Sequence, residues 1–357
     1  MRFQNRNFSC PNTLPLIADE INNKQFEHKS YKLTIKKQTM KLLLFMLFSI
    51  MTYNATSQNI EKVIVSDNDP DYLYINDNDS NELYYYKIVP KNKPIGCLVI
   101  MPSGGEKVED LLKQITLHHM AVNNDILVVI PSINWGTDDR KVDNLFLDTI
   151  FKQIVSIHEV SKDKFIMGGL SNAGMISLNY AQQSKMDNNN TFLVPKGVFA
   201  LDPPVDFAHF YQYCKREMKR NISKAGYAEA SYMIDKYNQQ FGGSPANFPE
   251  EYIKGSIFSY GAEDGGNTKY LKDIPIRIYT DLDLEYLLND RHRDLYDWNG
   301  TDLVAMINQL KILGNIDANI LISQGKGIRL NGMRTSHSWS ILDNGDCLVW
   351  ILSLLKN

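Results

Sequence analysis

A serine framed by small residues is the strongest candidate for chemistry in this chain. A short apolar run at 165–167 leads into Gly-Gly-Leu-Ser-Asn-Ala-Gly at 168–174, and apolar residues at helical spacing follow. The order strand, glycine-framed serine, helix is typical of a nucleophile elbow, a tight turn that presents Ser171 to a substrate. Such a turn accepts only small side chains two residues before and after the serine. Gly169 and Ala173 meet this need, although Ala173 replaces the usual glycine.

The motif around Ser171 is weak evidence when it stands alone. A sequence of the form G-x-S-x-[GA] is expected by chance in about one chain in four of this length. The alternative interpretation is a glycine-rich turn in which Ser171 only caps the following helix. A phosphate-binding loop fits less well, because no Gly-Lys-Ser or Gly-Lys-Thr follows. The choice therefore depends on the rest of the chain.

The segments on both sides of this turn alternate between short apolar runs and amphipathic runs. This alternation predicts a mostly parallel sheet with helices on both faces. The first two strands have no helix between them, which predicts an antiparallel edge. The predicted strands are 82–89, 95–101, 126–131, 165–167, 197–201, 274–280 and 319–323, and the predicted helices are 108–122, 142–160, 301–313 and 340–356.

The interval 206–262 interrupts this alternation. It is long, helical in character and rich in tyrosine and phenylalanine. We expect a helical cap over the carboxyl ends of the strands, with aromatic side chains such as Phe210 and Tyr211 lining a substrate pocket. The alternative is a helical decoration that only packs on the surface.

On these residues the chain resembles the α/β-hydrolases, over about residues 82–357. Within that superfamily it is similar to secreted esterase-like members that carry a C-terminal His-Ser-Trp, here at 337–339. The resemblance implies an α/β-hydrolase fold, with a mostly parallel central sheet, helices on both faces and the cap insertion. It also implies a serine nucleophile, an Asp or Glu and a histidine in that order along the chain.

By position, the resemblance implies that Ser171 is the nucleophile and His337 the base that takes its proton. The acid that orients the imidazole is expected after the strand 274–280, where Asp281, Asp283 and Glu285 lie. Asp283 is preferred because a turn there can direct it toward His337, and Asp281 and Glu285 remain alternatives.

The same resemblance implies an oxyanion hole built from two backbone N–H groups. Asn172 directly follows the nucleophile and supplies the first. The second is expected from Ser103-Gly104-Gly105, after the strand 95–101, with Gly104 as first choice. The family's His-Gly-Gly-Gly is here Pro-Ser-Gly-Gly, which leaves the identity of this second donor open.

The hypothesis that follows is a serine hydrolase acting on a small-molecule or polymeric carboxylic ester through an acyl-enzyme. A peptidase of the same fold and a non-catalytic binding protein on a hydrolase scaffold are the alternatives. The mechanism needs no cofactor and no metal, and no His/Cys/Asp cluster has zinc spacing. The net charge of −3 gives no reason to expect nucleic acid as a partner.

The N-terminal part has the pattern of an export signal. The apolar run 41–51 is too short to span a bilayer, lysines at 36, 37 and 41 precede its first leucine, and Ala-Thr-Ser at 55–57 suits cleavage near Gln58. We therefore predict a signal peptide at 40–57, a hydrolase domain at 58–357, and a secreted or periplasmic protein without a stable membrane anchor. Residues 1–39 form an N-terminal extension and suggest Met40 as the true start. A genuine disordered arm followed by a buried or anchoring helix is the alternative.

Overall fold

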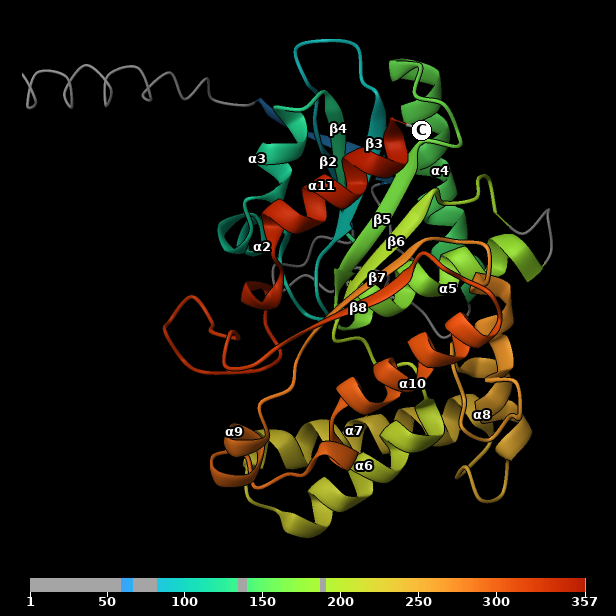
Figure 1. Cartoon of the computed structure of the whole chain (residues 1–357), viewed down its shortest axis with the longest axis vertical. Coiled ribbons are helices and arrows are strands. Elements are labelled where there is room, and N and C mark those ends of the chain that lie inside the picture. The colour runs from blue at the N-terminus through green and yellow to red at the C-terminus, as the bar shows by residue number, and fades with distance from the viewer. Residues whose placement is uncertain (1–58, 67–81, 134–139, 187–190, 357) are drawn as a thin grey trace, which may run out of the picture. The chain divides into compact units, whose positions relative to one another are not determined.

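The computed structural model describes residues 59–66, 82–133, 140–186 and 191–356 (Figure 1). The predicted extension 1–39 and signal peptide 40–57 lie outside these residues. The described chain contains an eight-stranded sheet in the order β1-β2-β4-β3-β5-β6-β7-β8. The strands are β1 (Ile60–Ser66), β2 (Leu83–Ile88), β3 (Gly96–Met101), β4 (Ile126–Pro131), β5 (Phe165–Leu170), β6 (Gly197–Leu201), β7 (Ile276–Asp281) and β8 (Ala318–Ser323).

The sheet is parallel from β4 through β8 and antiparallel at one edge, as predicted. β2 pairs antiparallel with both β1 and β4, and all other neighbours are parallel. Every residue of β3, β4, β5 and β6 is buried, which explains why these strands read as continuous apolar runs. The edge strand β1 was not predicted from the sequence, and its residues are mostly exposed.

Helices cover both faces of the sheet. In Figure 1, α3 and α11 lie on one face and α4 and α5 on the other. Phe151 of α4 contacts the rings of Phe165 in β5 and Tyr180 in α5, with centroid separations of 5.3 and 5.5 Å. These helices are α2 (Val108–Gln114), α3 (Leu117–Val122), α4 (Arg140–His158), α5 (Asn172–Met186) and α11 (Asn344–Leu355), while α10 (Asn299–Ile312) packs beside β7 and β8.

The predicted helix 108–122 is two helices, with a break at Ile115 and Thr116. The side-chain oxygen of Asn344, at the start of α11, accepts hydrogen bonds from the backbone N–H groups of Thr116 and Leu117. A residue distant in sequence therefore caps α3, and local periodicity could not reveal this. No helix in the described ranges is long and apolar enough to cross a membrane.

The segment between β6 and β7 is helical, as expected, with α6 (Phe207–Arg220), α7 (Lys224–Phe241) and α8 (Pro249–Gly255). These helices lie with α10 at the lower end of Figure 1. Their aromatic rings pack against one another: Phe207 contacts Tyr237, and Phe241 lies 4.4 Å from Tyr252 between centroids. Phe210 contacts Tyr237 and Tyr211 contacts Tyr252 in the same cluster, which differs from the expectation that these two side chains line a substrate pocket.

Candidate active site

Ser171 lies on a sharp turn between the last residue of β5 and the first residue of α5. Its φ is 59°, in the left-handed region that a residue with a side chain rarely adopts. Two backbone hydrogen bonds hold this conformation: Ser171 N–H donates to the oxygen of Leu201 at 2.8 Å, and its own oxygen accepts from Met175 N–H at 3.0 Å. The strand, serine, helix order expected from the sequence is present.

The small residues around Ser171 are required by close backbone approach. A Cβ at position 169 would lie 2.4 Å from the Cβ of Ala173 and 2.9 Å from the oxygen of Met101. A Cβ at position 174 would lie 2.9 Å from the Cβ of Ala200. Each of these distances is below any ordinary carbon contact. Ala173 is therefore tolerated because position 169 opposite it is a glycine.

The imidazole of His337 is held by Asp202, which lies directly after β6. Nδ1 of His337 is 2.7 Å from Oδ2 of Asp202, and Oδ1 of Asp202 accepts a hydrogen bond from the Thr280 hydroxyl at 3.1 Å. Asp202 is fully buried and has a φ of 45°. Burial raises the pKa of the Asp202 carboxyl, and the hydrogen bonds from His337 and Thr280 oppose that rise.

The structure corrects the expectation that Asp283 orients His337. The Asp283 carboxylate caps α9 (Leu284–Asn289) by accepting from Tyr286 N–H, and it accepts from Nη2 of Arg334 at 2.9 Å. The hydrogen bond from Arg334 holds the pKa of Asp283 below its ordinary value. Glu285 accepts from the side chain of Asn289 and is exposed.

The third candidate, Asp281, organises the segment that precedes His337. It is buried at the end of β7 and accepts from Nη2 of Arg334 at 2.7 Å. Its carboxylate also accepts from the backbone N–H groups of Lys326 and Gly327. The carboxylates after β7 are thus occupied by Arg334 and backbone donors, and the carboxylate after the neighbouring strand β6 reaches His337 instead.

Ser171 and His337 line one cavity of about 530 Å³. Asn172 and the loop Ser103-Gly104-Gly105 line the same cavity, so the structure brings together the predicted nucleophile, base and amide donors. Gly105 has a φ of 77°, which a glycine adopts without strain. Of the helical segment between β6 and β7, Glu229 of α7 is the residue that borders this cavity.

Glu106 links the glycine loop to the histidine segment, and the sequence reasoning missed it. Its Oε2 accepts from Ser103 N–H at 2.9 Å and from Nε1 of Trp339 at 2.8 Å, while Gln114 donates to Oε1. Burial raises the pKa of Glu106, and these hydrogen bonds oppose that rise. No local pattern marks Glu106, because its contact with Trp339 joins residues 233 positions apart.

No protein-family model and no curated protein sequence matches the chain. Solved structures match it in fold at low sequence identity. An acylaminoacyl peptidase of Pyrococcus horikoshii aligns over 85% of this chain at 12% identity and a TM-score of 0.51, and this chain covers 43% of that peptidase. An S-formylglutathione hydrolase from Agrobacterium tumefaciens aligns over 84% of this chain and 97% of its own length, at 12% identity and a TM-score of 0.50.

A structure described as a lipase in its open form aligns over 84% of this chain and 100% of its own length, at 11% identity and a TM-score of 0.50. Identities this low establish the architecture alone. The sheet order, the antiparallel edge, the turn at Ser171 and these matches together show that the chain has the fold of the α/β-hydrolase superfamily.

Proposed function

We propose that the chain is a serine hydrolase that cleaves a carboxylic ester through an acyl-enzyme on Ser171. One observation carries the proposal: a serine in the left-handed conformation shares a cavity with a histidine whose Nδ1 is held by a buried aspartate. His337 acts as the base and Asp202 as the acid that orients it. The amides of Asn172 and Gly104 are the proposed oxyanion donors.

In the proposed reaction, Oγ of Ser171 attacks the ester carbonyl carbon while Nε2 of His337 takes the hydroxyl proton. The carbon–oxygen bond to the alcohol then breaks, and His337 returns that proton to the leaving oxygen. Water attacks the acyl-enzyme by the same route and releases the acid. Asp202 stabilises the imidazolium formed in each half, and its hydrogen bond to Nδ1 keeps Nε2 directed away from the carboxylate.

The ester substrate is proposed on the named activities of two solved structures that this chain matches over nearly their whole length. The lipase and the S-formylglutathione hydrolase are matched over nearly all of their length, whereas the acylaminoacyl peptidase is matched over less than half of its length. A binding protein that has lost catalysis would have no need for the strained Ser171 conformation.

A serine-reactive probe tests the proposal. A fluorophosphonate should label the parent protein and a Ser161→Ala control, in which an exposed serine ten residues before Ser171 is removed, but not Ser171→Ala. Hydrolysis of a panel of short acyl, acetyl-sugar and feruloyl esters should follow the same pattern and rank the acyl groups. Labelling and turnover that persist in Ser171→Ala would overturn the proposal.

We also propose that the protein is exported, on the basis of residues 41–57. The N-terminal sequence of the natively expressed protein should begin close to Gln58. An intact chain retained in the cytoplasm would contradict export without affecting the catalytic proposal.

A further inference from the structure

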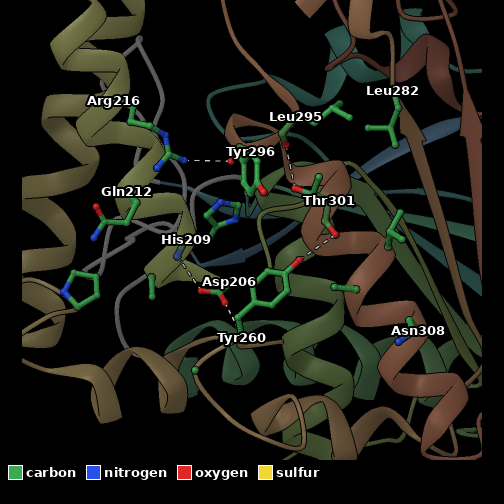
Figure 2. Close-up of a pocket in the computed structure, with 15 residues that line it drawn as sticks. Asp206, His209, Gln212, Arg216, Tyr260, Leu282, Leu295, Tyr296, Thr301 and Asn308 are labelled. Atoms are coloured by element: carbon green, nitrogen blue, oxygen red, sulfur yellow. Dashed lines mark hydrogen bonds between the residues drawn. The ribbon is translucent and has the colours of Figure 1, made fainter.

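A second cavity of about 1140 Å³ lies between α6 and α10. It is lined neither by Ser171 nor by His337. Figure 2 shows Arg216, Gln212 and His209 on the α6 side, facing the α10 side that carries Thr301 and Asn308. Its volume slightly exceeds the range of about 300–1,000 Å³ typical of small-molecule sites.

The wall opposite α6 is largely apolar. Val304 and Ala305 of α10 line it, together with Leu282 and Leu295 from the segments after β7. Val304 is 40% exposed and Tyr296, at the rim, is 73% exposed. Apolar side chains gathered in a solvent-open hollow provide a surface that an apolar occupant would cover favourably.

The carboxylates beside the cavity are already engaged. The two oxygens of Asp206 accept from the backbone N–H groups of His209 and Tyr260, at 3.0 and 2.8 Å. The buried Asp297 accepts from both Arg216 and Arg220. Asp302 lies 2.6 Å from Nδ1 of His209. These acids are committed to internal donors, so the cavity is not arranged to receive a cation.

The donors on α6 are only partly used. Nδ1 of His209 is occupied by Asp302, which leaves Nε2 as the ring nitrogen that can donate to an occupant. The hydrogen bond with Asp302 also raises the pKa of His209, which favours the charged imidazolium. Arg216 and Arg220 share one carboxylate, Asp297, so these three side chains carry one excess positive charge. Asp206 adds a negative charge at the cavity wall, and both of its oxygens are occupied by backbone N–H groups. Arg216 remains partly exposed at the cavity.

From this arrangement we propose that the cavity binds a carboxylic acid with an apolar body. Its carboxylate lies beside His209 and Arg216, with the exposed amide of Gln212 between them on the same helix. Its hydrocarbon part lies against Leu282 and Val304. The inference concerns a second site and does not rest on catalysis at Ser171.

Calorimetric titration of the full chain carrying Ser171→Ala tests this site without turnover. Octanoate should bind, whereas 1-octanol, which lacks the charge, and propionate, which lacks the hydrocarbon body, should each bind at least about tenfold more weakly. Arg216→Gln and His209→Gln should each weaken octanoate by about tenfold or more. Val304→Trp should abolish binding by filling the apolar half.

Lys219→Gln is the matched control, because Lys219 is an exposed cation on α6 that does not line the cavity. Arg216 also holds the buried Asp297, so a loss of binding in its variant can reflect lost stability. Gln212→Leu removes the amide beside the bound carboxylate, Val304→Trp fills the apolar half, and both leave that ion pair intact. Each of these two variants should also weaken the binding of octanoate. Octanol binding as tightly as octanoate would overturn the proposal. Octanoate binding unchanged in Val304→Trp would overturn it too, because the ligand would then lie elsewhere.

Discussion

Two histidine–aspartate pairs in this molecule have nearly the same local geometry. Nδ1 of His337 lies 2.7 Å from Asp202, and Nδ1 of His209 lies 2.6 Å from Asp302. Both carboxylates are buried. The ring of Trp298 contacts His337 edge-on and lines a small hollow together with His209 and Asp302, so one aromatic side chain stands between the two pairs.

The two pairs differ in what faces the free side of the imidazole. His337 shares its cavity with Ser171 and the glycine loop. The His209 cavity contains the hydroxyl of Thr301, but that hydroxyl donates to the backbone oxygens of Leu295 and Trp298. A histidine held by an aspartate is therefore only a positioned imidazole. The strained serine beside His337, not the pair itself, is the basis on which nucleophilic catalysis is proposed.

The largest effect that separates the pairs is expected from Asp202→Asn. The asparagine nearly conserves shape but no longer enforces the required tautomer of His337 or stabilises its imidazolium. We expect kcat for ester hydrolysis to fall by about 10⁴, as for the equivalent change in a well-studied triad. Asp302→Asn makes the same change at the other pair and should leave kcat close to that of the parent. Equal losses in the two variants would show that the comparison is wrong.

The next effect concerns the carboxylates after β7. Asp281→Asn leaves Arg334 and the backbone N–H groups of Lys326 and Gly327 with a poorer partner, and we expect the free energy of unfolding to fall by about 3 kcal/mol. Asp283→Asn should cost about 1 kcal/mol or less, because that pair is more exposed. Urea denaturation measures both. A kcat lost in Asp283→Asn and kept in Asp202→Asn would restore the sequence-based choice of acid.

The choice of acid shows where prediction from sequence stops. The strand ends, Ser171 and His337 could be located because buried parallel strands are continuous apolar runs and the turns after them carry the candidate site residues. Which carboxylate meets His337 depends on how the segment before it folds back. Arg334 sets that path by binding Asp281 and Asp283, and such a long-range pairing leaves no local pattern.

The helical segment between β6 and β7 gives a second example. Its helices and aromatic content were predictable, but helical periodicity marks an apolar face without saying what covers it. The structure places Phe207, Tyr237 and Phe241 against one another. The groove between α6 and α10, with His209 and Arg216, was not predicted because it depends on the docking of two helices about 80 residues apart.

A smaller effect is expected at Glu106, a positioning residue for the His337 site alone. In Glu106→Gln a single side-chain oxygen must accept the hydrogen bonds from Ser103 N–H, Trp339 and Gln114. The new side-chain NH2 group then faces N–H groups, which cannot accept a hydrogen bond from it. We expect kcat to fall by about 10- to 100-fold with KM little changed, because the glycine loop shifts relative to His337. Glu109→Gln, an exposed change three residues away, is the control. A lowered melting temperature with kcat unchanged would assign Glu106 a purely structural role.

The smallest effect lies in the acid–base behaviour of histidines with and without a carboxylate partner. Nδ1 of His118 is buried and has no hydrogen-bond partner among the described residues. Burial lowers the pKa of His118 to about 4, whereas Asp302 raises the pKa of His209. Imidazole titration followed by NMR should therefore place His209 above and His118 far below the ordinary pKa, and Asp302→Asn should lower the value for His209 only.

These two shifts act on stability with opposite signs. Below about pH 6.5 the unfolded chain protonates His118 while the folded chain does not, so folding weakens as pH falls, by about 1–2 kcal/mol near pH 5. His209 binds its proton more tightly when folded, so its contribution is fully present below the unfolded pKa and is lost as pH rises through the folded pKa. His118→Phe should flatten the acid side of the stability curve, and His209→Gln the neutral-to-alkaline side. If His118→Phe leaves the stability curve below pH 6.5 unchanged, protonation of His118 does not limit stability there. The predicted contrast between His118 and His209 would then be wrong.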